Sequence, residues 1–245
     1  MLAEENSFNK LVRLYPSNFY PVVKFNPAKE RLLAFDFTEK NIELQQIDLQ
    51  DTEELGNYIS DQLKIKKAKF GYGGYNELRS LYKRSSLFDK DLKDKTNLNL
   101  AEEPRRLHIG IDIWGATGTE VFAPLDGWVH SFAYNRQLGD YGATIILLHR
   151  LKGLSFFTLY GHVSLKDIAN LKEGGYIIRG QKLAHFGKSE ENGHWPSHLH
   201  FQIIKDITRY RGDYPGVCKL SESKKYLQNS PDPDLILNMK RFITF

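Results

Sequence analysis

The stretch HLHFQII, residues 198–204, places strand-forming side chains on alternating faces. On a strand, residues i and i+2 point to the same side, about 6.5 Å apart. His198 and His200 therefore share one face, whereas Leu199 and Phe201 point into the core. Two neighbouring imidazoles can bind one metal ion, or one can bind while the other acts on a bound water molecule. The alternative is a half-exposed strand with two incidental histidines.

Five segments before this one have a similar strand-like composition. They are rich in Ile, Val, Phe and Tyr and are interrupted by Gly, Pro, Asn or Asp. Short strands at such spacing favour an antiparallel sheet or barrel over a parallel β-α-β fold. The segments are LHIGIDIW (107–114), TEVFAPLDGWVHSFAY (119–134), YGATIILLHR (141–150), LSFFTLYGHV (154–163) and GYIIRGQKLAHFG (175–187).

The chain before residue 105 has a different pattern. The runs RLLAFDF and NIELQQI predict two or three strands between residues 25 and 47. The segment DTEELGNYISDQLKI, residues 51–65, has an acidic first turn and a helical apolar stripe, so it predicts a helix. The glycines of FGYGGY (70–75) predict a turn, with a lid over a groove as the alternative. Residues 76–85 predict a second helix.

The charged stretch EEPRR, residues 102–106, marks a change in composition. We expect an α+β region of unknown role over residues 1–104 and a mainly β domain over 105–245, so that the chain is α+β overall. Within the second region, SLKDIANL predicts a short helix with Ser164 as its cap and Asp167 in the capping-box position. The turn-rich tail after residue 212 is expected to wrap the sheet.

The overall composition excludes several classes of protein. Of 245 residues, 41% are hydrophobic and 26% charged, with a net charge of +4, which argues against disorder and coiled coils. No apolar run approaches the roughly 20 residues of a membrane span. No dense Lys/Arg run is interleaved with aromatic residues, so we expect neither a transmembrane segment nor a nucleic-acid partner. The composition leaves the oligomeric state open.

The termini and the cysteine count bear on the compartment. The N-terminal residues contain no apolar signal-peptide core, so we expect a cytoplasmic protein unless a leader has been removed. In that case the protein would be periplasmic or secreted. Cys218 is the single cysteine, which excludes an internal disulfide, and we expect it to serve packing alone.

All eight histidines lie between His108 and His200, and the run HIGID opens this region. On an ideal strand His108 and Asp112 would be about 13 Å apart, too far to share one ion. A bend at Gly110 would bring them together, because glycine adopts backbone angles closed to other residues. The alternative is a histidine and an aspartate that flank an ordinary buried strand.

His162 follows Gly161 at the end of the apolar run FFTLY, where it could project into a cleft or be a simple turn residue.

Two histidines and one carboxylate form the three-ligand pattern of catalytic zinc, with a fourth position open for water. His108, Asp112 and His200 are the candidate ligands. The spare imidazoles could take the proton of that water and stabilise an oxyanion. HExxH is absent, which excludes the helical zinc-protease arrangement.

The ordered motifs HIGID, TEVFAPLDGWV, YGH, GQKLAHFGKS and HLHFQ resemble the lysostaphin-type or LytM-like zinc metallopeptidases. The resemblance covers residues 108–204. It implies an antiparallel β-sheet groove, or barrel-sandwich-like fold, with one zinc ion on its floor. It also implies a substrate among peptidoglycan peptides, which such enzymes often cut beside glycine or D-alanine.

The resemblance assigns a role to each matching residue. It makes His108, Asp112 and His200 the zinc ligands and His162 and His198 the catalytic pair. The distinction between His198 and His200 rests on the family alone.

The chain departs from the family pattern at several positions. EENGHWPSHLHFQ replaces the usual glycine-rich loop, Gln202 stands where Glu is usual, and Ala143 stands where Asn is frequent. These changes could shape the groove for something other than a standard cross-link.

The remaining candidate residues have weaker signals. His194 and Trp195 could line the groove, and Tyr141 could donate a hydrogen bond to an oxyanion. His149 and His185 are expected to be structural, and His130 has no assigned role.

We therefore expect a metalloendopeptidase in which zinc-bound water attacks an amide bond of a peptide or peptidoglycan fragment. One alternative is a module that binds peptidoglycan or a peptide without cutting it. The other is a hydrolase of a small intracellular amide or ester metabolite.

Overall fold

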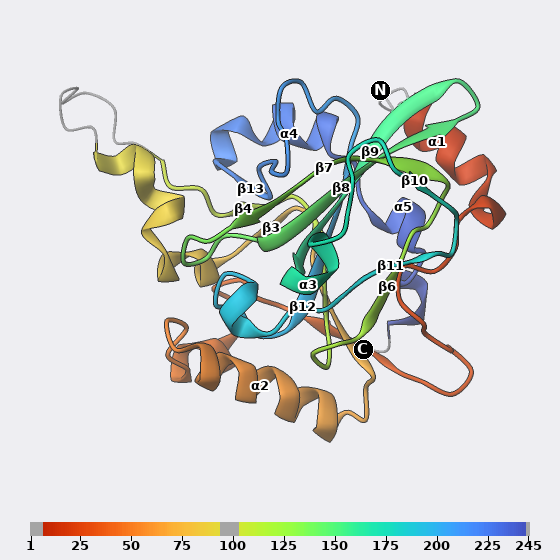
Figure 1. The fold of residues 1–245 in the computed structure, drawn as a ribbon. Coiled ribbons are helices and arrows are strands. Elements are labelled where there is room, and N and C mark those ends of the chain that lie inside the picture. Colours follow the sequence, from red (N-terminus) through yellow and green to blue (C-terminus); the bar gives the residue numbers. More distant parts are fainter. Residues whose placement is uncertain (1–6, 94–102, 244–245) are drawn as a thin grey trace, which may run out of the picture.

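A computed structural model describes residues 7–93 and 103–243, and an eight-stranded sheet forms its centre (Figure 1). All neighbouring strands in this sheet are antiparallel except the first two, which are parallel. In spatial order the strands are β1 (Leu32–Phe35), β2 (Phe70–Gly73), β5 (Ile111–Trp114), β12 (His198–Ile204), β9 (Leu154–Val163), β8 (Gly142–Leu151), β7 (Gly127–Asn135) and β10 (Tyr176–Ile177).

Two smaller sheets complete the β structure of the described residues. β6 (Glu120–Phe122) pairs with β11 (Lys182–His185), and β4 (Leu107–His108) lies between β3 (Glu77–Leu78) and β13 (Val217–Cys218). The predicted class, mainly β with an antiparallel sheet, is confirmed, and the sheet does not close into a barrel. Each of the six strand-like segments quoted above contains at least one strand.

The helices are few and lie around the sheet (Figure 1). They are α1 (Ser7–Leu14), α2 (Thr52–Ile65), α3 (Leu165–Ile168), α4 (Ser223–Asn229) and α5 (Asp234–Leu237). Short 3-10 helices span Pro16–Asn18, Ile42–Gln46, Ser80–Arg84, Ser86–Lys93, Ser189–Glu191, Leu220–Glu222 and Lys240–Phe242.

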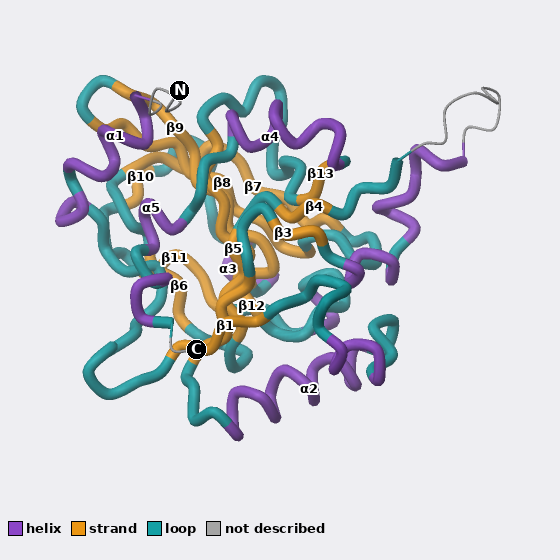
Figure 2. The backbone as a smooth tube through the Cα atoms, turned by 180° about the vertical axis from the view of Figure 1, so that it is seen from behind, coloured by secondary structure: helices purple, strands orange, loops and turns teal. Residues whose placement is uncertain are grey.

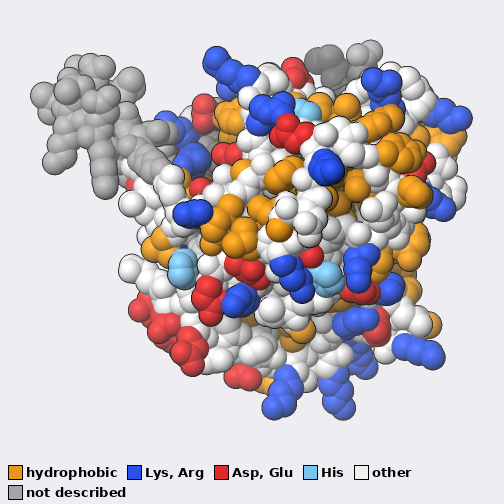
Figure 3. All heavy atoms as spheres, in the orientation of Figure 1, with side chains coloured by type: hydrophobic (Ala, Val, Ile, Leu, Met, Phe, Trp, Pro, Cys, Tyr) orange, Lys and Arg blue, Asp and Glu red, His pale blue; other side chains and the backbone are white. Residues whose placement is uncertain are grey.

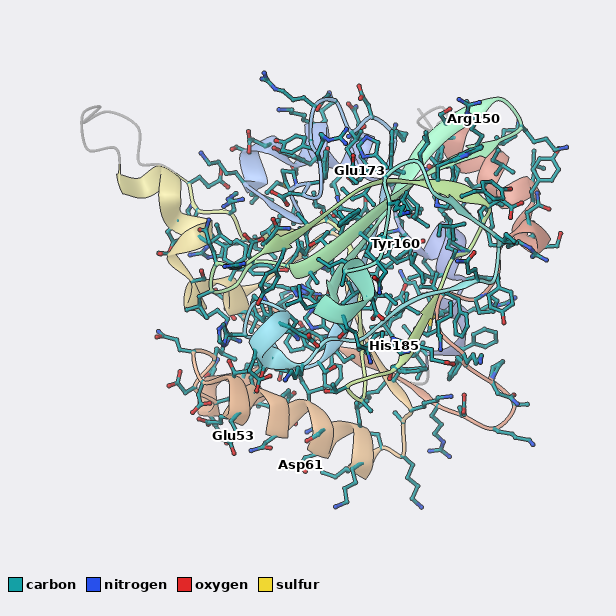
Figure 4. All side chains as sticks on the ribbon, viewed as in Figure 1. Glu53, Asp61, Arg150, Tyr160, Glu173 and His185 are labelled. Atoms are coloured by element: carbon teal, nitrogen blue, oxygen red, sulfur yellow. The ribbon has the colours of Figure 1, made fainter. Side chains whose placement is uncertain are left out.

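Helix α2 confirms the prediction for residues 51–65. The Asp51 side chain accepts hydrogen bonds from the backbone N–H groups of Glu53 and Glu54, which caps the helix. Its apolar stripe buries Leu55 and Ile59. The exposed side chains of Glu53 and Asp61 project from the opposite side of α2, away from the sheet (Figure 4).

On the face of the molecule shown in Figure 3, Lys and Arg side chains are interspersed with acidic side chains.

Three predictions for the N-terminal region are wrong. NIELQQI contributes a 3-10 helix rather than a strand, so only Leu32–Phe35 is a strand between residues 25 and 47. FGYG forms strand β2, so Gly71 and Gly73 make no turn, and the chain turns only after the strand, at Tyr75 and Asn76. The absence of a side chain at Gly71 makes room for the Phe35 ring. A Cβ at Gly71 would meet that ring at 2.3 Å. Residues 76–85 form β3 and a 3-10 helix, because pairing with β4 overrides their helical propensity.

The short helix after His162 is present as α3, but its predicted capping box is wrong. Ser164 occupies the cap position without a side-chain hydrogen bond. The Asp167 carboxylate instead accepts a hydrogen bond from the backbone N–H of His185 at 2.7 Å, on strand β11. A tertiary contact therefore replaces the local one.

The two predicted regions share the central sheet and its core. β2, from before residue 104, pairs with β5, from after it, and Figure 2 shows this part of the sheet from behind. The side chains of Leu32, Phe70 and Tyr72 belong to the same buried cluster as Ile111. The tail contacts both regions, because Tyr72 donates a hydrogen bond to Asp234 at 3.0 Å and β13 pairs with β4. In the described ranges, no helix combines the length and apolarity of a membrane span.

Candidate metal centre

Strand pairing brings Asp112 and His200 together. They are direct partners across the antiparallel pair β5 and β12, so their side chains leave the sheet on the same face. Strand β4 ends at His108, the chain bends at residues 109–110, and β5 begins at Ile111. The bend returns the His108 side chain to Asp112, as the sequence predicts.

The reason for the glycine at the bend differs from the predicted one. The backbone φ angle of Gly110 does not lie in the positive range that favours glycine. Its hydrogen instead makes room for the His200 ring, because a Cβ at this position would lie 2.3 Å from Cε1 and 2.4 Å from Nε2 of that ring. Close approach, rather than unusual backbone angles, therefore requires glycine here.

The three candidate ligands form a compact triangle of donor atoms. His108 Nε2 lies 3.0 Å from His200 Nδ1 and 3.3 Å from Asp112 Oδ1, and His200 Nδ1 lies 3.0 Å from Asp112 Oδ1. Bonds of 2.0–2.1 Å to a tetrahedral zinc ion place two ligand atoms about 3.3 Å apart. The triangle therefore has the size of one face of a zinc tetrahedron. All three side chains are buried.

Outer hydrogen bonds orient both imidazoles of the triangle. His108 donates from Nδ1 to the carbonyl oxygen of Gly74 at 2.8 Å, which leaves the lone pair of Nε2 facing the triangle. His200 donates from Nε2 to Oε1 of Gln202 at 3.0 Å, which leaves its Nδ1 free to bind. The amide group of Gln202 is itself held, because its Nε2 donates to Pro215 O at 3.2 Å. Gln202, noted above as a departure from the family pattern, thus orients His200.

The carboxylate of Asp112 is held from both sides. Oδ1 faces the two imidazoles, and Oδ2 accepts a hydrogen bond from Arg79 Nη1 at 2.5 Å. Burial alone would raise the pKa of this carboxyl group, but His108 and Arg79 outweigh it and hold the pKa well below its usual range. Burial lowers the pKa of His108 to about 4. Neutral histidines and a charged carboxylate are the protonation states that a metal ion requires.

His162 and His198 lie beside the triangle with their ring centres 4.2 Å apart. His162 donates from Nδ1 to Asn192 O at 2.8 Å, and His198 donates from Nδ1 to Pro196 O at 2.7 Å. Each ring therefore keeps an unprotonated Nε2. His198 Nε2 is 3.9 Å from Asp112 Oδ1. Burial lowers the pKa of both imidazoles, that of His198 to about 4.

His162 has a strained backbone. Its φ of +62° lies in the left-handed region, which non-glycine residues rarely adopt. Two hydrogen bonds hold it there, from its N–H to Tyr141 O and from Gly187 N–H to its carbonyl oxygen, each 2.9 Å long. Such strain persists only where surrounding contacts impose it, and it is frequent at functional sites.

Four of the five side chains, all but that of His108, line a cavity with about 690 Å³ of empty space, including its open mouth. Trp195 lines it, as predicted for the groove, whereas His194, the other residue predicted there, is not among the lining residues. Tyr141 lines it as well. The Tyr141 hydroxyl, expected to serve an oxyanion, instead donates to Tyr214 O at 3.1 Å and lies 3.4 Å from His200 Nε2. Part of the wall comes from the N-terminal region, through Leu81, Tyr82, Leu87 and Phe88.

Sequence reasoning missed Arg79, the carbonyl oxygen of Gly74 and the wall formed by residues 81–88. Arg79 lies in the run NELRSLYKR, whose local pattern resembles a surface helix. The carbonyl of Gly74 has no side-chain signal. Only the pairing of β3 with β4 brings these groups behind His108 and Asp112.

The other histidines lie outside the triangle. His149 is bonded at both ring nitrogens, to Asp126 O at 2.9 Å and Thr158 Oγ1 at 2.7 Å. His185 pairs with Asp167 at 3.1 Å, His130 bonds Ser131 Oγ at 2.8 Å, and the side chain of His194 is exposed. Cys218 is buried in an apolar cluster with Leu107 and Ile109, and burial raises the pKa of its thiol to about 12.

Comparison with known proteins supports the resemblance stated above. Residues 106–211 match the sequence model of peptidase family M23, so the predicted family is confirmed for this part of the chain. A protein described as an uncharacterized metalloprotease of Haemophilus influenzae is 29% identical over 127 residues. The match covers 50% of this chain, which spans 25% of the length of that curated relative.

Two solved structures are similar over part of the chain. A zinc-containing peptidase from Vibrio cholerae aligns with a TM-score of 0.33 and 27% identity, covering 40% of this chain and 27% of that one. The catalytic domain of lysostaphin from Staphylococcus simulans aligns with a TM-score of 0.35 and 22% identity, covering 51% of this chain and 81% of that one.

Proposed function

We propose that this chain, whose residues 106–211 form a peptidase family M23 domain, is a zinc-dependent metallopeptidase that hydrolyses an amide bond. The convergence of His108 Nε2, Asp112 Oδ1 and His200 Nδ1 carries the proposal. Two neutral imidazole nitrogens and one carboxylate oxygen suit zinc, and three protein ligands leave a fourth position open. We assign one zinc ion per chain to this site.

When bound, zinc supplies a Lewis acid that polarises a carbonyl group and lowers the pKa of a coordinated water molecule. The protein must then move protons. His162 and His198 can each accept a proton at Nε2, because their Nδ1 atoms already donate to backbone carbonyls. A ring that has accepted the proton of the attacking water becomes a donor, to the oxyanion or to the leaving nitrogen. These two histidines are our proposed catalytic pair.

We propose a peptide as the substrate, most favourably a peptidoglycan-type peptide. The family resemblance supports the assignment of a peptidoglycan-type peptide. The cavity supports a peptide, because both aromatic side chains and polar or charged groups line it. Trp195 supplies one of these aromatic side chains.

Single substitutions test the assignment of roles. We expect the wild type to contain one zinc per chain by elemental analysis and to release new amines from muropeptides or glycyl peptides. His108→Ala and Asp112→Ala should lose the metal, because each removes a ligand. His162→Ala should keep the metal and lose turnover by about 10²–10⁴-fold, the usual contribution of general acid–base catalysis. His130→Ala, remote from the triangle, is the matched control and should keep both properties.

Stoichiometric zinc in His108→Ala would overturn the site assignment. A zinc-loaded wild type that binds muropeptides without releasing amines would favour a binding module instead. Turnover found only in a screen of small metabolites, and abolished by a chelator, would favour a hydrolase of amides or esters of that kind.

A further inference from the structure

We infer that Arg79 is a positioning residue of the metal centre, which holds Asp112 in the orientation that binds the ion through a single oxygen. The inference rests on the proposed zinc site and extends it to a segment outside the M23 match of residues 106–211. It makes the N-terminal region part of the centre rather than a neighbour of it.

Arg79 is buried and held in place by its backbone. Only 1% of the residue is exposed. Its backbone N–H donates to Arg106 O at 3.0 Å, which fixes this segment beside strand β4. The guanidinium carbon lies 5.4 Å from the centre of the Phe37 ring, so an aromatic face covers one side of the group.

The guanidinium bridges two carboxylates. Nη1 donates to Asp112 Oδ2 at 2.5 Å, and Nε donates to Glu77 Oε2 at 2.5 Å. Nη1 also lies 3.3 Å from the Tyr82 hydroxyl. A buried charge requires compensation, and Glu77 supplies it. The negative charge of Asp112 therefore remains available to a metal ion, although a cation contacts the same carboxylate.

The direction of these contacts decides how Asp112 can bind. With Oδ2 engaged by Arg79, only Oδ1 faces His108 Nε2 and His200 Nδ1. Released from Arg79, the carboxylate could rotate and offer both oxygens to the ion. With water still bound, the coordination number would then rise from four to five, and the tetrahedral arrangement around the open position would be lost. The carbonyl of Gly74, from the same segment, orients His108 in a similar way.

The test measures metal binding rather than turnover. Wild type, Arg79→Met and Arg79→Lys are prepared without metal, and zinc affinity is measured by competition with a chromogenic chelator. We expect Arg79→Met to weaken zinc binding 10–100-fold, the usual effect of losing an outer partner of a ligand. Arg79→Lys should show a smaller loss, because an ammonium keeps a positive charge beside Asp112 but cannot bridge both carboxylates. Arg106→Met is the matched control, since Arg106 pairs with Asp89 at 2.5 Å and is not a partner of the ligands.

The visible spectrum of the cobalt(II) forms separates positioning from general stability. We expect weaker absorption from Arg79→Met than from wild type, because five-coordinate cobalt absorbs less than four-coordinate cobalt. A folded Arg79→Met protein with wild-type zinc affinity and a wild-type cobalt spectrum would overturn the inference. If Arg79→Met does not fold, Arg79→Lys serves as the test. Wild-type zinc affinity together with a wild-type cobalt spectrum in Arg79→Lys would also overturn the inference. Failure of the wild type to bind zinc at all would instead refute the proposed function.

Discussion

At the scale of single residues, the candidate centre depends on contacts that exclude any larger side chain. The His200 ring occupies the space beside Gly110, and the Tyr141 ring occupies the space beside Gly161, where a Cβ would lie 2.4 Å from it. Both glycines sit inside motifs that also carry candidate site residues, HIGID and YGH. Their small size therefore serves the geometry of the site rather than the flexibility of the chain.

Gly110→Ala should displace the His200 ring and weaken zinc binding by at least 10-fold, because the new methyl group would overlap the ring. A chelator competition assay measures the change. Gly56→Ala is the control: this glycine lies inside α2, and its Cβ would make ordinary contact with Pro196 at 3.8 Å. That variant should keep its zinc affinity and gain about 1 kcal/mol in free energy of unfolding. Unchanged zinc affinity in Gly110→Ala would contradict the role given to this glycine.

At the scale of elements, the site is assembled by strand register. β12 places His200 opposite Asp112 on one side and opposite Gly161 on the other. A shift of one residue would turn both histidines of the HLH motif to the opposite face. The helices contribute to stability, and α2 also supports the loop before β12, because Thr52 Oγ1 donates to His194 O at 2.7 Å.

Asp51→Ala removes the cap of α2 and should lower the free energy of unfolding by about 1 kcal/mol. Urea denaturation measures this loss. Zinc affinity in the folded state should be unchanged, because α2 supplies no ligand. A loss of zinc binding in the folded variant would show that α2 determines the geometry of the centre, contrary to our expectation.

At the scale of the whole molecule, buried histidines couple stability to pH. His149 is fully buried in the sheet, and burial lowers its pKa from 6.5 to about 4. Between these values the unfolded chain binds the proton and the folded chain does not. Stability must therefore fall as the pH drops from about 6.5 towards about 4, by up to about 3 kcal/mol from this residue.

His149→Gln should remove that part of the pH dependence. We expect its urea midpoint to change less than that of wild type between pH 7 and pH 5, even if the variant is less stable at both. The slope, rather than the stability itself, is the measured quantity. Equal slopes in the two proteins would show that His149 does not titrate as its burial implies.

The division into residues 1–104 and 105–245 stays a prediction, and the shared sheet bears on it. A chain of residues 105–245 would leave the β2-facing edge of β5 unpaired and would lack Arg79 and the carbonyl of Gly74. We expect it to lack a cooperative thermal transition and to bind a dye for exposed apolar surface. A cooperative transition together with wild-type zinc affinity would establish the second region as an independent unit.

The local sequence pattern was enough to predict most elements after residue 105 and helix α2, but not the other elements before residue 105. Alternating β-branched and aromatic residues determine the strands from β5 to β12, and the acidic cap determines α2. The FGYG strand and the segment at residues 76–85 could not be predicted, because their partners, β5 and β4, are distant in sequence. The propensity of a short segment is a weak preference that such pairing overrides.

The sequence by itself determined the chemistry of the candidate site: which imidazoles and which carboxylate could bind a metal, and which family their order resembles. It also determined an antiparallel sheet, because alternation of side chains along a strand is a local property. Only the tertiary structure decided how these groups are oriented. The carbonyl of Gly74 and the guanidinium of Arg79 each fix one ligand. Hydrogen bonds between residues far apart in the chain leave no periodic trace in the sequence, so folding alone brings them together.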